Sequence, residues 1–476
     1  MAVALPSRAL DAGAWDRASD ELLRTLRDLI RIPSINPPPP DAPDGELRAA
    51  KYIAEVLGAA GVPAEIVEPV EGRGSVIASL HGDGSGGAPL LLLGHLDVVP
   101  APPEHWTHDP FAGDIADGYV WGRGAVDMKN LVAMEMTVIG LLAAEARAAG
   151  RDPASDPIPG LTRDIRFAVT ADEEAGGLAG IHWLVEDRPD SLAAAAAINE
   201  SGAVATTIDG RRFYPIGVAE KGYAVYRISV HGTWGHGSMP RDDNAAVRAG
   251  QVAARLNVQG VPRVTPTMRR FLLEMAEQLG GDMARVVRSL AADDPRLGEA
   301  AADALCDPMS ARVIRALLRD TVSPNVIHAG VKYNVIPGEA VVELDCRVLP
   351  GTTEEEMAAT VIERLGPELA AVCDVELVIF GEPVDAPAAG PLWDVMTATI
   401  RDHDPSGVPL PIMVPFATDA KHTARLGIPT YGFSPLQLDP DERFLERFHG
   451  TDERVGVDAL RWGLPVLYDV VRRFAG

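Results

Sequence analysis

The hydrophobic positions in the first part of the chain follow two different spacings in turn. Leucine and isoleucine at helical spacing predict amphipathic helices at 20–30 and 46–57, and a long buried helix is predicted at 127–149. Short apolar runs predict strands at 64–67, 75–80, 90–93, 164–170 and 193–198. Strands that alternate with helices predict an α/β fold, a mixed sheet with helices on both faces.

A second pattern begins near Glu220, where strands and helices no longer alternate in this way. The elements predicted there are a strand at 223–230, a helix at 244–256, a strand pair at 331–333 and 340–347 around the Pro337-Gly338 turn, a helix at 353–365 and a strand at 375–380. These elements predict a separate α+β region. From Leu392 the α/β pattern returns and ends in an amphipathic helix at 458–474.

The simplest domain organisation is one α/β domain in two parts, 1–218 and 385–476, interrupted by an inserted domain at 219–384. The inserted domain is expected to be an α+β lid or dimerisation domain. A helix-rich stretch at about 266–321 within it is interpreted as a further insertion. A chain of 476 residues exceeds one ordinary core, which agrees with two domains.

The composition excludes several classes of function. Lys and Arg number 43 against 68 Asp and Glu, a formal charge of −25, so we expect neither a nucleic-acid nor a membrane partner. No apolar window of about 20 residues could span a bilayer, and no sustained apolar segment resembles a signal peptide, so the expected location is cytoplasmic. The three cysteines, Cys306, Cys346 and Cys373, lack the spacing of a disulfide framework or a thiolate zinc site.

His95 and Asp97 follow the predicted buried strand at 90–93 and lie two residues apart. In extended backbone both side chains point the same way. Asp97 can then accept the second imidazole proton and fix which nitrogen of His95 faces a metal. A pair with this spacing is in most proteins no metal site, so other ligands must join it. Asp127, ahead of a long predicted helix, can bridge two cations, cap the helix, or do both.

Glu173 and Glu174 follow another predicted strand and precede two glycines. Adjacent glutamates at such a place repel each other unless cations neutralise them. Successive side chains diverge, so one can bind a metal while the other faces a substrate. The alternative is an exposed acidic turn. Glu200 follows the next strand in a similar way, and His449 supplies a second imidazole. Carboxylates combined with neutral imidazoles suit Zn²⁺, Mn²⁺ or Co²⁺ in a two-metal site.

At this point the chain resembles the M20 family of metallopeptidases, which includes aminoacylases, glutamate-type carboxypeptidases, carnosine dipeptidases, and acetylornithine and succinyl-diaminopimelate deacylases. The resemblance covers nearly the whole chain, from the helix near Asp20 to His449, and rests on six blocks in the family's order. The blocks are GHLDVVP (94–100), GRGAVDMKN (122–130), DEEAGG (172–177), HGSMP (236–240), NVIPGEAVVELDCRVLPG (334–351) and HGTDE (449–453).

The resemblance implies two divalent metal ions, with zinc favoured and cobalt or manganese as alternatives. The implied metal ligands are His95, Asp127, Glu174, Glu200 and His449. Asp127 would bridge, sharing one ion with His95 and Glu200 and the other with Glu174 and His449.

Catalytic roles follow from the same resemblance. Asp97 would orient His95, and Glu173 would be the general base. In the lid, His236 would stabilise the oxyanion, in some relatives across a dimer interface, and Asn334 and Arg347 would bind substrate. A bidentate guanidinium suits a substrate carboxylate.

The residues themselves leave two of these lid roles open. His236, flanked by glycines, is as a single feature more typical of a loop residue, and Arg347 as a single feature could be a strand-end ion pair.

The chain also departs from the family pattern. The helix-rich stretch at 266–321 is longer than the lid of the compact glutamate carboxypeptidases and is similar to that of the yeast vacuolar carboxypeptidase and the mammalian N-acyl-amino-acid branch. Ala417 replaces the glycine of a family GTDA motif, in Ala417-Thr418-Asp419-Ala420, which puts a backbone contact to substrate in doubt. Lys221 matches the entry to the first lid strand and receives no role.

We therefore expect a hydrolase that cleaves the amide bond of a small N-acyl amino acid or dipeptide with a free carboxylate, using hydroxide held by two metals and Glu173 as base. Two alternatives stay open: a biosynthetic deacylase of the acetylornithine or succinyl-diaminopimelate type, and a catalytically silent binding protein on the same fold. The sequence does not determine the acyl group, the native metal, whether a homodimer forms through the lid, or whether His236 acts in its own subunit.

Overall fold

The computed structural model describes residues 10–40, 42–258, 260–292, 297–298, 300, 308–440 and 442–476. Cys306 and part of the predicted insertion at 266–321 lie outside these residues. The chain forms two compact units. Unit 1 comprises the described residues of Met1–Gly217, Ala386–Leu410 and Thr418–Gly476, and unit 2 those of Val218–Asp385 and Pro411–Ala417.

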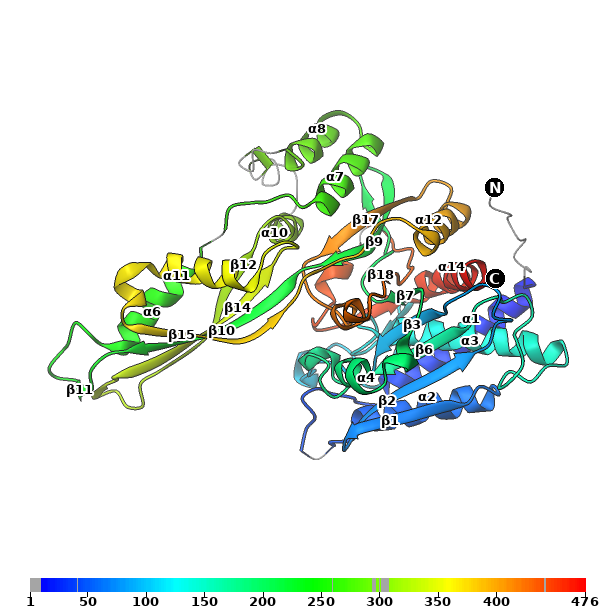
Figure 1. The fold of residues 1–476 in the computed structure, drawn as a ribbon, viewed down its shortest axis with the longest axis horizontal. Helices are drawn as coiled ribbons and strands as arrows, with labels where there is room; N and C mark the ends of the chain where they lie inside the picture. Colours follow the sequence, from blue (N-terminus) through cyan, green and yellow to red (C-terminus); the bar gives the residue numbers. More distant parts are fainter. Residues whose placement is uncertain are drawn as a thin grey trace. The chain divides into compact units, whose positions relative to one another are not determined.

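Unit 1 is built on a mixed sheet with the strand order β1-β2-β6-β3-β7-β18-β9 (Figure 1). Strands β6, β3, β7 and β18 run parallel to their neighbours among these four, while β1, β2 and β9 add antiparallel edges. The strands of this sheet that lie wholly or partly in unit 1 are β1 (Ala64–Val70), β2 (Arg73–Leu80), β3 (Leu90–His95), β6 (Ile165–Thr170), β7 (Ala196–Asn199), β8 (Thr206–Ile208), β9 (Arg211–Glu220), β17 (Val408–Val414) and β18 (Thr430–Gly432). The carboxyl ends of β3, β6 and β7 therefore lie at one edge.

A small antiparallel sheet, in the order β19-β5-β4, joins two distant segments of unit 1. Its strands are β4 (Asp114–Ala116), β5 (Tyr119–Trp121) and β19 (Arg454–Gly456). The pairing of β19 with β5 brings the C-terminal part of the chain next to the loop that leads to Asp127.

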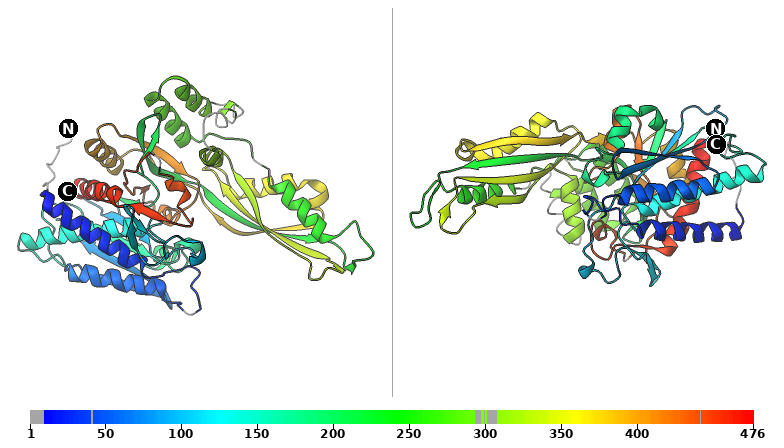
Figure 2. Two further views of the ribbon diagram at one scale, coloured as in Figure 1. Left: turned by 180° about the vertical axis from the view of Figure 1, so that it is seen from behind. Right: turned by 90° about the horizontal axis from the view of Figure 1, so that it is seen from below.

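Helices cover both faces of the unit 1 sheet because the strand residues alternate in direction. Leu91 and Leu93 pack with Ile181 and Leu184 on one face. The next residue, Gly94, faces the opposite side, where α3 packs so closely that a Cβ atom on Gly94 would meet Val132. Figures 1 and 2 show α1 and α3 side by side. The helices of unit 1 are α1 (Ala12–Ile30), α2 (Gly45–Ala59), α3 (Lys129–Ala148), α4 (Ile181–Asp187), α5 (Pro189–Leu192), α12 (Pro391–His403), α13 (Ala420–Thr423) and α14 (Val457–Ala475), with 3₁₀ turns η1 (Pro103–His105), η2 (Glu173–Ala175), η3 (Ala424–Leu426) and η4 (Phe444–Glu446).

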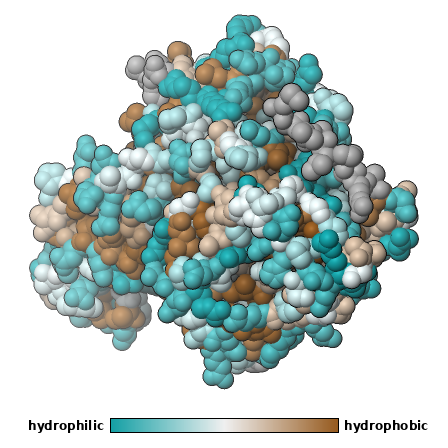
Figure 3. All heavy atoms as spheres, turned by 45° about the vertical axis from the view of Figure 1, so that its right-hand side comes forward, coloured by the Kyte–Doolittle hydropathy of each residue, from teal (hydrophilic) through white to brown (hydrophobic). Residues whose placement is uncertain are grey.

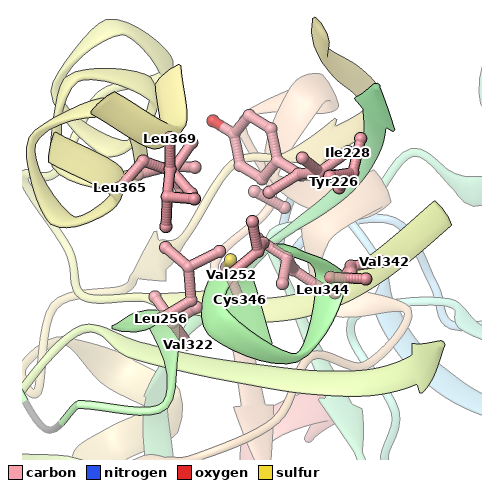
Figure 4. Close-up of a cluster of buried hydrophobic side chains, with 14 of the residues drawn as sticks. Tyr226, Ile228, Val252, Leu256, Val322, Val342, Leu344, Cys346, Leu365 and Leu369 are labelled. Carbon is pink, nitrogen blue, oxygen red and sulfur yellow. The ribbon is translucent and has the colours of Figure 1, made fainter. Parts of the chain in front are cut away.

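Unit 2 holds a four-stranded antiparallel sheet in the order β12-β14-β10-β15. One face carries a hydrophobic core against α6 and α11, which Figure 4 shows around Tyr226, Val252, Leu344 and Leu365. The elements of unit 2 are β10 (Gly222–His231), β11 (Gly235–His236), β12 (Thr321–Ala329), β13 (Val335–Ile336), β14 (Glu339–Val348), β15 (Cys373–Gly381) and β16 (Val384–Asp385), and α6 (Ala245–Leu256), α7 (Pro266–Gln278), α8 (Gly281–Leu290), α10 (Pro308–Leu317) and α11 (Glu354–Ala370).

The predicted fold class is confirmed: a mixed sheet with helices on both faces, and a separate antiparallel-sheet unit inserted in the chain. The predicted strand pair at 331–333 and 340–347 is wrong. β14 pairs with β12 and β10 instead, and Val331 and Tyr333 lie in a loop with exposed side chains. The pattern misled because isolated apolar residues in a loop resemble a short strand.

Among the described residues, none of the helices combines the length and hydrophobicity required to traverse a lipid bilayer. On the face that Figure 3 displays, hydrophobic residues are interrupted by hydrophilic ones.

Candidate metal centre

His95 is the last residue of β3 and is almost fully buried. Its Nδ1 lies 3.0 Å from the backbone carbonyl oxygen of Asp97 and 3.5 Å from Oδ1 of that residue. Its Nε2 faces two other carboxylates, Asp127 at 3.1 Å and Glu200 at 3.7 Å. Both ring nitrogens face oxygen acceptors, so the protonated ring donates from both. A metal ion held at Nε2 would take the place of that proton and leave the other proton on Nδ1, facing Asp97.

Asp127 lies between the two histidines. Its Oδ1 is 3.1 Å from Nε2 of His95, and its Oδ2 is 3.3 Å from Nε2 of His449. Burial raises the pKa of Asp127, but hydrogen bonds with both imidazoles outweigh burial and hold the pKa below 3.8. The N-cap of α3 is Met128, so Asp127 does not take the capping position. Its peptide bond to Met128 is cis.

Glu174 and His449 form the other side of the cluster. The carboxylate oxygens of Glu174 lie 3.2 and 3.1 Å from Nε2 of His449. Burial raises the pKa of Glu174 to about 7, and it raises the pKa of Glu200, which follows β7, well above 4.5. Hydrogen bonds to Asp127 and Glu174 raise the pKa of His449 to about 10. The protonation of each carboxyl group and imidazole in the cluster therefore depends on the charge of its neighbours.

The ligand atoms fall into two groups, in each of which they lie within 4.8 Å of one another. The groups are His95, Asp127 and Glu200, and Asp127, Glu174 and His449. Each offers one imidazole nitrogen and two carboxylates, and Asp127 directs one oxygen to each group. This donor set suits a divalent cation such as Zn²⁺, Co²⁺ or Mn²⁺. The residues therefore fit two divalent ions that share one carboxylate.

The carboxylate of Asp97 organises the loop that carries the two glutamates. It is fully buried and accepts the backbone N–H groups of Glu173 at 3.1 Å and Glu174 at 3.0 Å. Asn36 donates to its Oδ2 at 2.7 Å. Asp172, just before the glutamates, has a φ of 72°, and this left-handed residue turns the chain away from β6. Asp97 thus fixes where the glutamate pair begins.

The structure separates the two adjacent glutamates. Glu174 belongs to the group of His449, whereas the side chain of Glu173 lies outside both groups. Its Oε1 is 3.6 Å from Nζ of Lys421, on α13. Burial raises the pKa of Glu173 above 4.5, although the charge of Lys421 opposes that shift. The sequence predicted that the pair diverges, but it gave no signal for Lys421.

Glu453 and Arg123 support the cluster from behind, and no role was predicted for either. Glu453 is fully buried, and its Oε1 accepts the backbone N–H groups of Val126 at 2.7 Å and Asp127 at 3.1 Å. Its Oε2 accepts from Arg123 at 2.6 Å, and Arg123 also lies 3.4 Å from the carbonyl oxygen of His449. The sequence did contain one sign of this role. Glu453 lies in the HGTDE block, four residues after the candidate ligand His449, and a glutamate there is either exposed to solvent or paired with a donor.

In unit 2, His236 and Asn334 come together. His236 on β11 pairs with Val335 on β13, and the N–H of Gly237 donates to the carbonyl oxygen of Asn334 at 2.8 Å. The Nδ1 of His236 accepts the N–H of Ser238 at 3.2 Å, so the neutral ring carries its proton on Nε2. The buried Oδ1 of Asn334 has no hydrogen-bond partner in the described part of the chain.

Arg347 lies elsewhere in unit 2. It stands on β14 and forms a two-pronged ion pair with Asp345, with Nε–Oδ1 at 2.8 Å and Nη2–Oδ2 at 3.3 Å. An ion pair near the end of a strand was the alternative role predicted for Arg347, and here its partner is two residues away in the sequence. Arg347 pairs in register with Tyr223, whereas Glu339, at the other end of β14, pairs with His231. The structure therefore does not bring Arg347 together with His236.

The model of peptidase family M20/M25/M40 matches residues 91–473. The N-fatty-acyl-amino acid synthase/hydrolase PM20D1 of Xenopus tropicalis is 28% identical over 254 residues, covering 52% of this chain and 47% of that protein. The probable carboxypeptidase S-like 2 of Dictyostelium discoideum is 27% identical over 407 residues, covering 81% and 71%. The chain spans about half the length of several curated relatives that it matches.

Among solved structures, the M20 family metallo-carboxypeptidase Sso-CP2 from Sulfolobus solfataricus superposes with a TM-score of 0.70 at 18% identity, covering 96% of this chain and 99% of that one. At this identity the likeness establishes a shared fold.

Proposed function

Because the chain belongs to peptidase family M20/M25/M40, we propose that it is a dinuclear metal-dependent hydrolase of linear amide bonds. The substrate class is a small N-acyl amino acid or dipeptide with a free carboxylate. The observation that carries this proposal is the position of Asp127, whose two oxygens face two separate histidine–carboxylate groups. The relatives named as an N-fatty-acyl-amino acid hydrolase and as a carboxypeptidase support the substrate class.

In this proposal His95, Asp127 and Glu200 hold one ion, and Asp127, Glu174 and His449 hold the other, with zinc favoured over cobalt and manganese. When bound, the ions supply Lewis acidity and lower the pKa of a water molecule. The protein residues fix the ligand geometry and move the proton.

Glu173 is proposed as the general base. It stands next to a ligand in sequence, yet its side chain lies outside both ligand groups, which leaves it available for proton transfer. Burial raises its pKa above 4.5, which brings its proton affinity closer to neutral pH, where a base is effective. Its carboxylate takes the proton from the attacking water and delivers that proton to the nitrogen of the leaving amine.

His236, Asn334 and Arg347 are proposed to contact substrate. The Nε2–H of His236 can donate to a carbonyl oxygen as negative charge develops. Arg347 already carries Asp345 in a two-pronged pair, so a substrate carboxylate has to share or replace that partner.

The distance between these residues supports a homodimer. Glu339 and Arg347 are eight residues apart on one strand, which corresponds to about 27 Å. His236 lies beyond the Glu339 end, five residues after His231. Arg347 and His236 of the same unit 2 are therefore too far apart to contact one small substrate together. We propose that a second copy supplies His236.

The deciding experiment combines metal analysis with a hydrolysis screen of N-acyl amino acids and dipeptides. The native protein should contain about two divalent ions per chain, lose activity with a chelator and regain it with Zn²⁺, Co²⁺ or Mn²⁺. Glu173→Gln should keep both ions while kcat falls by about 10²-fold or more. Full activity in metal-free protein would exclude the proposal. Turnover of only acetylornithine or succinyl-diaminopimelate would instead favour the biosynthetic alternative.

Mixing tests the proposed exchange of His236. Two inactive variants, His236→Ala and Glu173→Gln, should regain part of the native activity when their subunits are exchanged, because one mixed site then contains both native residues. A monomer in solution with native activity would refute the shared site.

A further inference from the structure

Glu173 and Glu174 are chemically identical neighbours, yet the ligand cluster contains Glu174 alone. Something must keep the other carboxylate out of the ligand positions, because a carboxylate so close to a divalent ion is itself a good ligand. The side chain of Glu173 lies next to Lys421, whose Nζ is 3.6 Å from Oε1. Both side chains are nearly enclosed, with exposures of 8% for Lys421 and 10% for Glu173.

The position of Lys421 is fixed by the ends of two strands of the unit 1 sheet. Just before it, Thr418 accepts a hydrogen bond from Asn199 of β7 at 3.0 Å. Asp419 accepts one from Thr170 of β6 at 2.8 Å. These strands lead directly to Glu200 and Glu173. The short helix α13 is therefore tied to the same strand ends that carry the candidate ligands and the candidate base.

The charges around Lys421 explain its burial. An ammonium group removed from water is unfavourable unless anions face it. The Glu173 carboxylate lies on one side, 3.6 Å from Nζ. Burial raises the pKa of the neighbouring Asp419 to about 7, and the charge of Lys421 opposes that shift. Asp419 is itself anchored by Thr170. Lys421 is thus a fixed cation at the edge of the ligand cluster, on the side of Glu173.

We propose that Lys421 is a positioning residue that keeps Glu173 out of the metal coordination and available as the base. The ammonium attracts the Glu173 carboxylate and, as a positive charge, disfavours a divalent ion on that side of the cluster. This inference rests on the proposed function for the role of Glu173, but its main consequence concerns coordination. Without Lys421, Glu173 turns toward the metals and becomes an additional ligand.

Cobalt substitution tests this consequence directly, because the visible absorption of protein-bound Co²⁺ reports the number of its ligands. Lys421→Met should change the cobalt spectrum toward higher coordination, while Lys421→Arg, which keeps the charge, should retain the native spectrum. Adding Glu173→Gln to Lys421→Met should restore the native spectrum, because the amide is a much poorer ligand. The exposed Lys51→Met on α2 is the matched control and should change nothing.

An unchanged cobalt spectrum in Lys421→Met, or a changed spectrum that the added Glu173→Gln does not reverse, overturns the proposal. Should the methionine variant not fold, Lys421→Gln makes the same comparison with a polar side chain.

Kinetics supply the second readout. In Lys421→Met, kcat should fall about tenfold or more with KM within about twofold, since the base is displaced and substrate contacts are kept. Lys421→Arg should restore most of kcat. A rise in KM with an unchanged kcat would contradict the positioning role, because it would mean that Lys421 serves substrate binding. If the native protein hydrolyses no amide, the proposed function fails, while the cobalt spectra still decide whether Lys421 controls Glu173.

Discussion

Replacing Glu135 with methionine should stabilise the protein, and increasingly so as the pH rises. Glu135 lies on α3 with no exposed surface, and neither carboxyl oxygen has a hydrogen-bond partner among the described residues. A buried polar group without a partner costs about 1–3 kcal/mol even when it is neutral. Methionine has a similar length, no polar atoms and an adaptable shape. Glu135→Met should therefore be more stable than the native protein by about this amount at low pH.

The pH dependence follows from the ionisation of the same group. Burial raises the pKa of Glu135 well above 4.5 in the folded protein. Between pH 4.5 and that raised pKa, the unfolded chain has released the proton and the folded chain has kept it. The free energy of unfolding then falls by about 1.4 kcal/mol for each pH unit, and the contribution of Glu135 is lost as pH rises through this window. The variant lacks this loss.

The assay compares unfolding of both proteins in urea between about pH 5 and pH 8, with metal removed so that metal binding adds no pH dependence. The gap between the curves should widen by about 1.4 kcal/mol per pH unit until the pH reaches the raised pKa of Glu135, and stay constant above it. Glu145→Met on the same helix is the control. Glu145 pairs with Arg472 at 3.4 Å and with the hydroxyl of Tyr468, so its loss should destabilise. A constant gap for Glu135→Met, or a less stable variant, refutes the reasoning.

Three further predictions concern the candidate site. Glu453→Gln should lower the free energy of unfolding by about 3–5 kcal/mol, since it leaves the buried Arg123 without its anion. The variant should also bind zinc more weakly in a chelator competition. An unaltered zinc affinity would contradict the supporting role of Glu453. Asn36→Ala, which removes a donor to Asp97, should weaken zinc binding about tenfold, and equal affinity by the same competition would show that Asp97 needs no such donor. Arg347→Ala should raise KM about tenfold or more for substrates with a free carboxylate but not for the corresponding amides. Arg227→Ala, on the same sheet, is the control and should leave KM unchanged. An equal effect on both kinds of substrate would exclude carboxylate binding by Arg347.

Much of the fold follows from local pattern. The helices at 20–30 and 127–149 and the strand at 90–93 were predicted from spacing and correspond to α1, α3 and β3, because each buries one continuous apolar stripe or run. Strand β12 was missed. Its Ser323-Pro324-Asn325 segment interrupts the alternation, and the structure shows a register shift between Pro324 and Val326. Proline is tolerated there because β12 is an edge strand.

The clustering of His95, Glu174 and Glu200 could be predicted because they lie at the ends of apolar strands whose carboxyl ends share one edge. The supporting residues could not. Glu453 reaches the backbone of Val126 across 327 positions of sequence, and Lys421 reaches Glu173 from a helix with no apolar pattern. Their neighbours are set by the pairing of distant strands. No local spacing encodes that pairing, so the sequence predicts candidate ligands but not the residues that hold them in place.

The order of the sheet has a consequence for biosynthesis. Strand β18 lies between β7 and β9, although it is made long after both. While the ribosome adds the residues of unit 2, the nascent unit 1 exposes the unpaired edge of β7, and such an edge invites association with other chains. His449 emerges later still. The candidate metal centre is therefore complete only late in synthesis, after β18 is available to cover the edge of β7.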